Sequence, residues 1–213
     1  MPKDYVLFDL DGTLLDSLPL IETTFRHVFR KMNIPWDNGA VMKTVGLPLR
    51  DACRQFAGDR WQEFFDCYVN YQLTIHDQYI KLFPGTAEAL RQIRPLVKGV
   101  GVVTSKRRPM ARRGIATTGL DRYLDVVVAL EDVEKPKPDA EPVLRGLEKL
   151  GAAPDRAVFV GDSLFDVQAG RAANVTTIGV TWGMASREDL QAAGPDHIVD
   201  TWPDLVEVLK SLN

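Results

Sequence analysis

The 213-residue sequence is poor in the residues that hold disulfides and transition metals. It has two cysteines, Cys53 and Cys67, which form no C-x-x-C pair, and three scattered histidines, His27, His76 and His197. Two isolated thiols are more typical of free cysteines than of a disulfide. The sequence therefore predicts free cysteines and shows no Cys/His cluster for a metal such as zinc.

Long hydrophobic runs and an excess of charge are also missing. No apolar stretch approaches the roughly 20 residues of a membrane span, and no charged start with an apolar core resembles a signal peptide. The net charge is −3, with 45% hydrophobic and 26% charged residues. This balance argues against a general surface for nucleic acids or anionic membranes. We expect a globular cytoplasmic protein with no membrane or nucleic-acid partner.

Two aspartates follow the first apolar run. Tyr5–Phe8 predicts a buried strand, and Asp9-Leu10-Asp11-Gly12-Thr13 predicts a sharp turn after it. A calcium-binding EF-hand loop is excluded because its glycine would stand at the sixth position, not the fourth. A simple turn explains Asp11 but not Asp9, because a charge at a buried strand end is costly unless it is paired or bound to metal. The pair therefore favours a catalytic metal site.

The chain then divides into two kinds of sequence. Residues 17–83 show apolar residues at helical spacing and no convincing strand. From residue 84 onward, short apolar strands alternate with helices, which is typical of a parallel sheet covered on both faces. We predict an α/β fold in which residues 1–16 and 84–213 form a Rossmann-like core domain. Residues 17–83, here called the helical insertion, form a small α-helical domain.

Polar residues follow two further strands of the predicted sheet. Thr104-Ser105-Lys106 comes after the strand at 100–103, and Asp162 and Asp166 come after the strand at 158–160. A lysine-rich loop, residues 135–139, precedes the latter strand. Each segment alone could be a helix cap or a solvated surface charge. Because the carboxyl ends of parallel strands share one edge of a sheet, we expect all of them to gather around Asp9 and Asp11.

These segments resemble the four motifs of the haloacid dehalogenase-like hydrolase superfamily, and the resemblance covers essentially the whole chain. The motifs correspond, in order, to Asp9-x-Asp11-Gly12-Thr13, Thr104-Ser105-Lys106, the segment beginning at Lys137, and Gly161-Asp162-Ser163-x-x-Asp166. Lys135 competes with Lys137 for the third motif. Lys137 fits the family spacing to Gly151, although Ala140 replaces the usual second proline.

The helical insertion resembles the small helical cap of the phosphoglycolate phosphatase-like branch. Residues 46–50 are similar to a cap loop that reaches over the site, and residues 71–77, 118–121 and 181–183 are similar to bacterial pyrophosphatases of the PpaX type. We therefore expect Arg50 and His76 to contact substrate from the cap.

The resemblance implies phosphoryl chemistry at the two aspartates. Asp9 is expected to attack phosphorus and form an aspartyl phosphate, and Asp11 to act as general acid and then general base. A dehalogenase would not need Asp11. Mg2+ is expected on Asp9, the backbone carbonyl of Asp11, and Asp162, with Asp166 orienting a water or a neighbouring side chain.

The remaining core residues are expected to hold the phosphoryl group. Thr104 and the backbone N–H of Ser105 would bind its oxygens, Lys137 would offset negative charge, and Lys106 would meet a second anionic group of the substrate. We expect a Mg2+-dependent phosphohydrolase of a small phosphorylated metabolite, phosphoglycolate first and pyrophosphate as the alternative. A phosphosugar mutase or a non-catalytic binding protein is less well supported. The sequence leaves open the substrate and whether the chain is a monomer or a homodimer.

Overall fold

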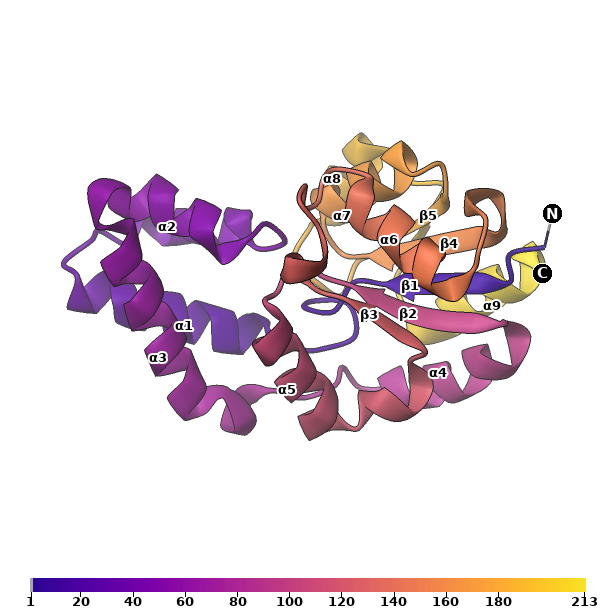
Figure 1. The fold of residues 1–213 in the computed structure, drawn as a ribbon, viewed down its shortest axis with the longest axis horizontal. Coiled ribbons are helices and arrows are strands. Elements are labelled where there is room, and N and C mark those ends of the chain that lie inside the picture. Colours follow the sequence, from indigo (N-terminus) through magenta and orange to yellow (C-terminus); the bar gives the residue numbers. More distant parts are fainter. Residues whose placement is uncertain (1) are drawn as a thin grey trace.

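The computed structural model describes residues 2–213 and contains one parallel sheet of six strands (Figure 1). The strand order is β3-β2-β1-β4-β5-β6. The strands are β1 (Tyr5–Phe8), β2 (Gly99–Val103), β3 (Val126–Val128), β4 (Ala157–Gly161), β5 (Thr176–Val180) and β6 (His197–Val199). The expected α/β fold with a parallel sheet is confirmed. Because β1 lies between β2 and β4, the residues that follow these three strands are neighbours.

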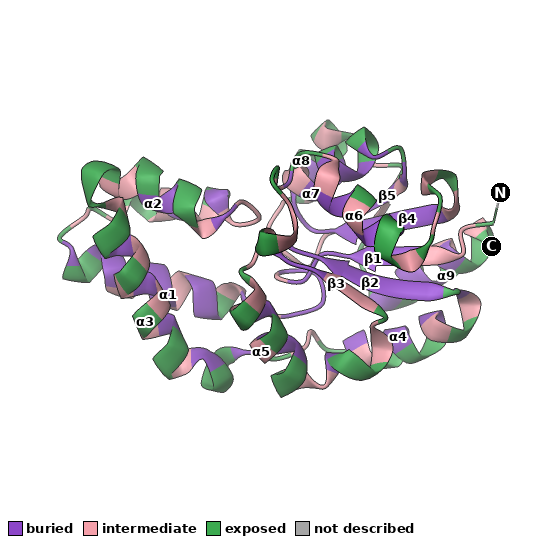
Figure 2. Ribbon diagram, in the orientation of Figure 1, coloured by how far each residue is buried: buried purple, intermediate pink, exposed green. Residues whose placement is uncertain are grey.

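Helices cover both faces of the sheet. On one face, Val6, Phe8 and Val102 pack with α4 (Thr86–Ile93), α5 (Arg108–Thr118) and α9 (Trp202–Leu212). On the other face, Leu7 and Phe159 pack with α6 (Glu141–Leu150) and α7 (Leu164–Ala172). Figure 2 shows the strands buried and the outer helix faces exposed. A further helix, α8 (Arg187–Ala193), lies between β5 and β6 in the sequence. Near-continuous apolar strands form here because neither sheet face meets water.

The helical insertion builds a hydrophobic core of its own. Its helices are α1 (Leu18–Lys31), α2 (Leu49–Ala57) and α3 (Trp61–Tyr79), with a 3-10 segment at Asp37–Thr44. Aromatic side chains dominate the contacts between them, including Phe25, Phe29 and Phe64. The two ends of the insertion meet at the sheet, where the backbone N–H of Asp16 donates to the carbonyl of Lys81 at 2.9 Å. The insertion therefore lies beside the sheet edge, as the purple helices of Figure 1 show.

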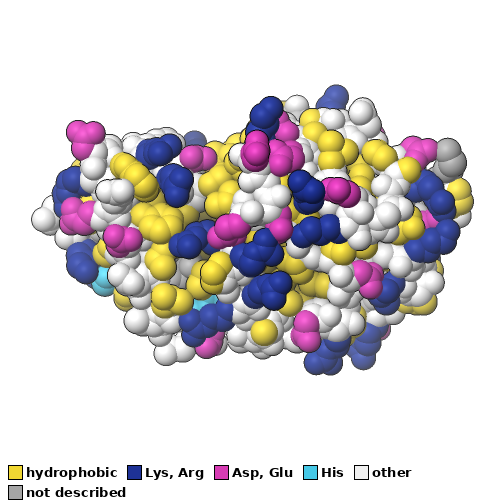
Figure 3. Space-filling model, in the orientation of Figure 1, with side chains coloured by type: hydrophobic (Ala, Val, Ile, Leu, Met, Phe, Trp, Pro, Cys, Tyr) yellow, Lys and Arg dark blue, Asp and Glu magenta, His cyan; other side chains and the backbone are white. Residues whose placement is uncertain are grey.

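Cys53 and Cys67 are both free, as expected. Basic and acidic side chains are interspersed on the face drawn in Figure 3. Within residues 2–213, no helix combines the length and the apolar character needed to cross a membrane.

Candidate active site

The end of β1 places Asp9 at the centre of a buried charge cluster. The Asp9 side chain is almost fully buried, and its backbone N–H donates to the carbonyl of Val160 at 2.8 Å. Lys137, which is 1% exposed, donates from Nζ to Oδ1 of Asp9 and to Oδ1 of Asp166, both at 2.6 Å. Lys135 is exposed. Of the two competing lysines, Lys137 is thus the one that the structure brings to the aspartates.

Asp162 is held against Asp9 by the segments that follow β1 and β5. It accepts hydrogen bonds from the Thr13 hydroxyl at 2.9 Å and from the backbone N–H of Met184 at 2.7 Å. Two glycines make room for its carboxylate. A Cβ atom at Gly12 or at Gly183 would lie 2.2 Å from Oδ2 of Asp162. The end of β5 is therefore a further part of the site, which the sequence could have indicated because β5 ends at the same sheet edge.

Asp166 lies in the first turn of α7 and is bound on both oxygens. Its Oδ2 accepts from the backbone N–H and the hydroxyl of Ser163, and its Oδ1 accepts from Lys137. Ser163 in turn caps α7 by accepting from the backbone N–H of Asp166. The helix start thus fixes Asp166, and Asp166 together with Asp9 fixes Lys137.

The three carboxylates form an oxygen-rich group suited to a divalent cation. One oxygen from each of Asp9, Asp162 and Asp166 can be chosen so that all three lie within 4.8 Å of one another. Burial raises the pKa of Asp162 to about 7, and the carboxylate of Asp166 adds to the shift. Burial also raises the pKa of Asp9 well above its ordinary value, although Lys137 opposes this effect.

The charge of the cluster is incompletely balanced. Burial alone would lower the pKa of Lys137, but the charges of Asp166 and Asp9 raise it above its ordinary value, so the ammonium stays charged. With all three carboxylates ionised, this one ammonium would leave two negative charges in a buried place, and burial accordingly raises the pKa of Asp9 and Asp162. Hard oxygen ligands with this residual charge fit Mg2+, whose charge would offset both.

Asp11 lies beside this cluster and faces a different set of partners. It accepts from the Ser17 hydroxyl at 2.6 Å, and Lys106 Nζ bonds both of its oxygens at 2.7 and 2.9 Å. Ser17 directly precedes α1, but its side chain makes no capping bond and binds Asp11 instead.

The end of β2 supplies hydroxyl groups. Thr104 is buried, and its Oγ1 accepts from the backbone N–H of Lys106 at 3.1 Å. The Ser105 Oγ is buried and finds no hydrogen-bond partner among residues 2–213. A buried hydroxyl without a partner is costly, which indicates a site where a ligand oxygen binds.

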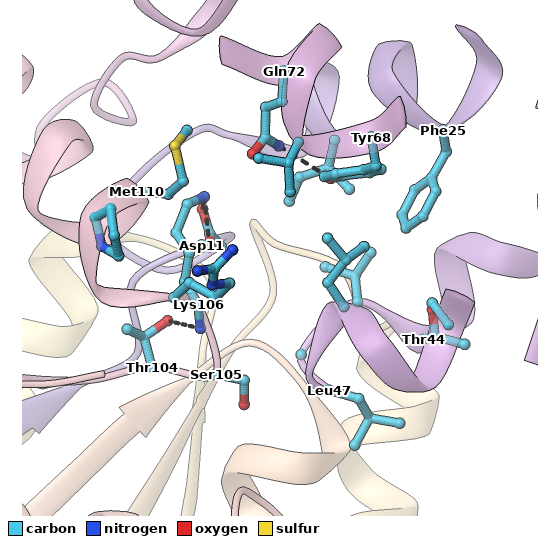
Figure 4. Close-up of a pocket in the computed structure, with 18 of the residues that line it drawn as sticks. Asp11, Phe25, Thr44, Leu47, Tyr68, Gln72, Thr104, Ser105, Lys106 and Met110 are labelled. Atoms are coloured by element: carbon cyan, nitrogen blue, oxygen red, sulfur yellow. Dashed lines mark hydrogen bonds and ion pairs between the residues drawn. The ribbon is translucent and has the colours of Figure 1, made fainter. Parts of the chain in front are cut away.

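A cavity of about 330 Å³ opens between this sheet edge and the helical insertion. Asp9, Asp11, Thr104, Ser105 and Lys106 line it from the sheet, and side chains of α1, α2, α3 and residues 44–47 line it from the insertion. Figure 4 shows Asp11 and Lys106 facing Gln72 and Tyr68 across the cavity. The aspartate expected to react and the aspartate expected to transfer protons therefore both line the same cavity.

Two expected substrate contacts do not line this cavity. Arg50 is exposed, and its guanidinium carbon lies 5.6 Å from the centre of the Trp61 ring. In α2, Ala52 and Cys53 are the residues buried in the insertion, which turns Arg50 outward. In this structure Arg50 therefore lies outside the cavity lining, and its contact with substrate stays a prediction.

His76 is fully buried outside the cavity lining. Its Nδ1 lies 2.7 Å from Asp77, and burial lowers its pKa. It lies one helical turn beyond Gln72 on α3 and near Gly114 of α5. The structure thus packs His76 between α3 and α5, and its contact with substrate stays a prediction.

The sequence and the fold both match known proteins. A model of the family described as haloacid dehalogenase-like hydrolase matches residues 6–180. The "Putative pyrophosphatase PpaX" of Caldanaerobacter subterraneus subsp. tengcongensis is 37% identical over 96% of this chain and 94% of its own. The "Pyrophosphatase PpaX" of Oceanobacillus iheyensis is 30% identical over 96% of this chain and 95% of its own. A solved structure from Lactobacillus plantarum, titled a "putative phosphoglycolate phosphatase", has a TM-score of 0.87 and 31% identity, covering 98% of this chain and all of that one.

Proposed function

Because the chain belongs to the haloacid dehalogenase-like hydrolase family, we propose that it is a Mg2+-dependent phosphohydrolase that forms an aspartyl phosphate on Asp9. One observation carries this proposal. Asp9 lies with Asp162, Asp166 and Lys137 in a buried charge cluster and also lines the cavity next to Asp11. A carboxylate placed between a cation site and a ligand cavity can attack a bound phosphoryl group in line.

In the first step, an oxygen of Asp9 attacks phosphorus and the bond from phosphorus to the leaving oxygen breaks. Asp11 donates a proton to that oxygen. In the second step, water attacks the phosphorus of the aspartyl phosphate, Asp11 accepts the water proton, and phosphate leaves. Lys106 and Ser17 both donate to Asp11. These bonds fix the position of the Asp11 carboxyl group beside Asp9.

The other residues hold the reacting groups. Mg2+ bound by Asp9, Asp162 and the backbone carbonyl of Asp11 would offset the charge of the phosphoryl oxygens. Thr104 and Ser105 border the cavity beside Asp9 and would donate to these oxygens. Lys137 keeps Asp9 in place, and Asp166 keeps Lys137 in place. We assign Asp166 this positioning role because both of its oxygens already accept bonds.

We propose that residues 17–83 act as a cap over residues 1–16 and 84–213. The separate hydrophobic core of the insertion and the meeting of its two ends at Asp16 and Lys81 support movement as a unit. A cap that closes over the sheet edge excludes water from the aspartyl phosphate until the leaving group departs.

The names of the relatives support phosphoglycolate and pyrophosphate as the first compounds to test. The partner of the chain is then a small phosphorylated metabolite, and we propose a cytoplasmic enzyme that works as a monomer or homodimer.

A phosphate-release assay over a panel of small phosphate compounds, run with Mg2+ and with excess chelator, tests the proposal. We expect turnover that needs Mg2+ and is lost in Asp9→Asn. Full activity in chelator, or one tenth of wild-type turnover in Asp9→Asn freed of deamidated protein, would contradict it.

A further inference from the structure

The wall that the helical insertion contributes to the cavity carries no charge. Among residues 2–213, the insertion residues that line the cavity include no lysine, arginine, histidine, aspartate or glutamate. Most are apolar, among them Ile21, Phe25, Leu47, Ala52, Val69 and Leu73. This wall lies opposite Asp11 and Lys106 (Figure 4), where the part of a substrate beyond its phosphoryl group has to lie.

The polar groups of this wall are neutral. Gln72 donates from Nε2 to the Tyr68 hydroxyl at 3.1 Å, and both residues line the cavity. The Tyr68 hydroxyl proton and the Gln72 carbonyl oxygen are left for a ligand. The Thr44 hydroxyl is already used, because it donates to the carbonyl of Val41 at 2.7 Å. Such groups suit a hydroxyl or an amide, whereas a second charge would be buried without a counter-ion.

The two cations in the cavity lining have partners within the protein. Lys106 binds both oxygens of Asp11. The Arg107 side chain lies between Glu131, 3.5 Å from its Nε, and the ring of Phe65, 5.4 Å from its guanidinium carbon. A second anionic group of a substrate would have to break one of these contacts to gain a counter-charge.

The cavity is also larger than a bare phosphate needs. Its volume of about 330 Å³ lies within the range of roughly 300–1,000 Å³ typical of pockets for organic ligands. The apolar part of such a wall favours ligand binding by burying apolar surface of the ligand.

We propose that the chain prefers phosphate monoesters of uncharged, largely apolar alcohols, with the apolar part held against α1, α2 and α3 and any hydroxyl bound by Gln72 and Tyr68. The proposal rests on the phosphohydrolase function above and narrows its substrate class. Compounds that carry a second anionic group, including pyrophosphate and phosphoglycolate, are then poorer substrates.

Straight-chain alkyl phosphates from methyl to hexyl test this preference. Their leaving alcohols react alike, so chain length changes only the apolar contact. We expect kcat/KM to rise about fourfold per methylene, as the transfer of a methylene group from water implies, and to exceed the values for pyrophosphate and phosphoglycolate. Calorimetry with hexylphosphonate and methylphosphonate gives the same comparison for binding, without turnover.

Leu73 offers a variant at the cavity mouth that is not needed for folding, because its side chain is 42% exposed. Leu73→Ala should lower kcat/KM for hexyl phosphate several-fold more than it lowers kcat/KM for methyl phosphate. Leu73→Arg should shift the preference toward pyrophosphate. Leu144→Ala is the matched control, since Leu144 is 43% exposed on α6 outside the cavity; it should change neither value.

Two outcomes separate this inference from the proposed function. If kcat/KM does not change along the alkyl series, or is higher for pyrophosphate or phosphoglycolate, the inference is wrong while Asp9-dependent hydrolysis stands. If no phosphate compound is hydrolysed, the proposed function fails and the inference fails with it.

Discussion

Lys137 is the residue on which the charge balance of the site depends. It is the ammonium that bridges Asp9 and Asp166, and it is 1% exposed. Its length is needed because it comes from the loop before α6, while the aspartates follow β1 and β4.

Replacement of this lysine should damage both stability and turnover. Lys137→Met leaves two buried carboxylates without their cation, and we expect the free energy of unfolding to fall by about 3–5 kcal/mol. We expect kcat/KM to fall by roughly a hundredfold or more, because the removal of one group that stabilises charge in a transition state lowers rates by about this factor. Lys135→Met, two residues away and exposed, is the control and should match wild type. Urea denaturation and phosphate release measure the two effects; equal behaviour of both variants would refute the role of Lys137.

Asp162 should make the metal-free protein sensitive to pH. Its pKa is raised to about 7 in the folded state, so the folded protein holds this proton more tightly than the unfolded chain. Protonated Asp162 therefore contributes fully to the free energy of unfolding at low pH, and this contribution declines as pH rises from about 4 to about 7. Mg2+, which binds the ionised form, should restore it.

Asp162→Asn tests this reasoning. An amide can accept from Met184 and donate to Thr13, and it carries no charge to be repelled. Without metal, the Tm of the variant should exceed that of wild type, by a margin that grows from pH 5 to pH 8. Addition of Mg2+ should raise the Tm of wild type only. An equal Mg2+ response in the two proteins would show that Asp162 is not a ligand.

Single residues also show where sequence reasoning ends. Asp9 and Asp162 could be placed near each other because both follow strands of a parallel sheet, and strand ends are read from apolar runs. The directions of Arg50 and His76 could not be predicted, because the direction of a side chain on a helix depends on which face packs inward. Packing within the insertion turns Arg50 outward, whereas His76 faces Gly114 of α5, outside the insertion.

At the scale of secondary-structure elements, the turn after β1 and the loop after β5 enclose Asp162. Gly12 has φ of +85°, and a Cβ there would collide with the carboxylate. The strands themselves were predictable from their apolar runs, and so was their common edge. The place of the end of β5 at that edge was therefore also predictable, but the hydrogen bond from the backbone N–H of Met184 to Asp162 was not, because residue type does not mark a backbone donor.

Gly12→Ala should impair the protein in two ways, by straining the backbone and by displacing the carboxylate of Asp162. Gly151 also has a positive φ, +63°, but a Cβ there would meet no atom of residues 2–213 within 4 Å. In both Gly→Ala variants, the left-handed conformation should lower the free energy of unfolding by about 1–2 kcal/mol. Only Gly12→Ala should also displace Asp162. We expect Gly12→Ala to weaken Mg2+ binding at least tenfold and Gly151→Ala to leave it unchanged. A Mg2+ titration followed by activity and by Tm measures this, and equal Mg2+ affinities would show that the close approach is unimportant.

At the scale of the whole molecule, the chain has separate cores for the sheet and the insertion. Phe64 is fully buried among the aromatic residues of the insertion, and Phe159 of β4 is buried on the face of the sheet covered by α6 and α7. The general plan of an insertion into an α/β fold could be predicted, because helical and strand periodicities differ. The cavity between the two parts could not, because it depends on how their surfaces meet.

Separate cores predict local responses to core substitutions. Phe64→Ala should lower the free energy of unfolding by about 3–5 kcal/mol. It should increase amide hydrogen exchange in α1–α3 more than in β1 and β4. Phe159→Ala should show the opposite distribution. Hydrogen exchange followed by mass spectrometry measures both, and a uniform increase over the chain in either variant would mean that the two parts unfold as one unit.

The central claim is the covalent intermediate on Asp9, and chemical trapping tests it most directly. The enzyme is mixed with a saturating substrate and Mg2+, quenched in acid, and treated with borohydride, which reduces an acyl phosphate to an alcohol. In the wild-type protein, peptide mass spectrometry should then find homoserine at residue 9 and unchanged aspartate at residue 11. In Asp9→Asn, every aspartate should be unchanged. Rapid turnover with aspartate intact at residue 9, or homoserine at residue 11 instead, would contradict the account.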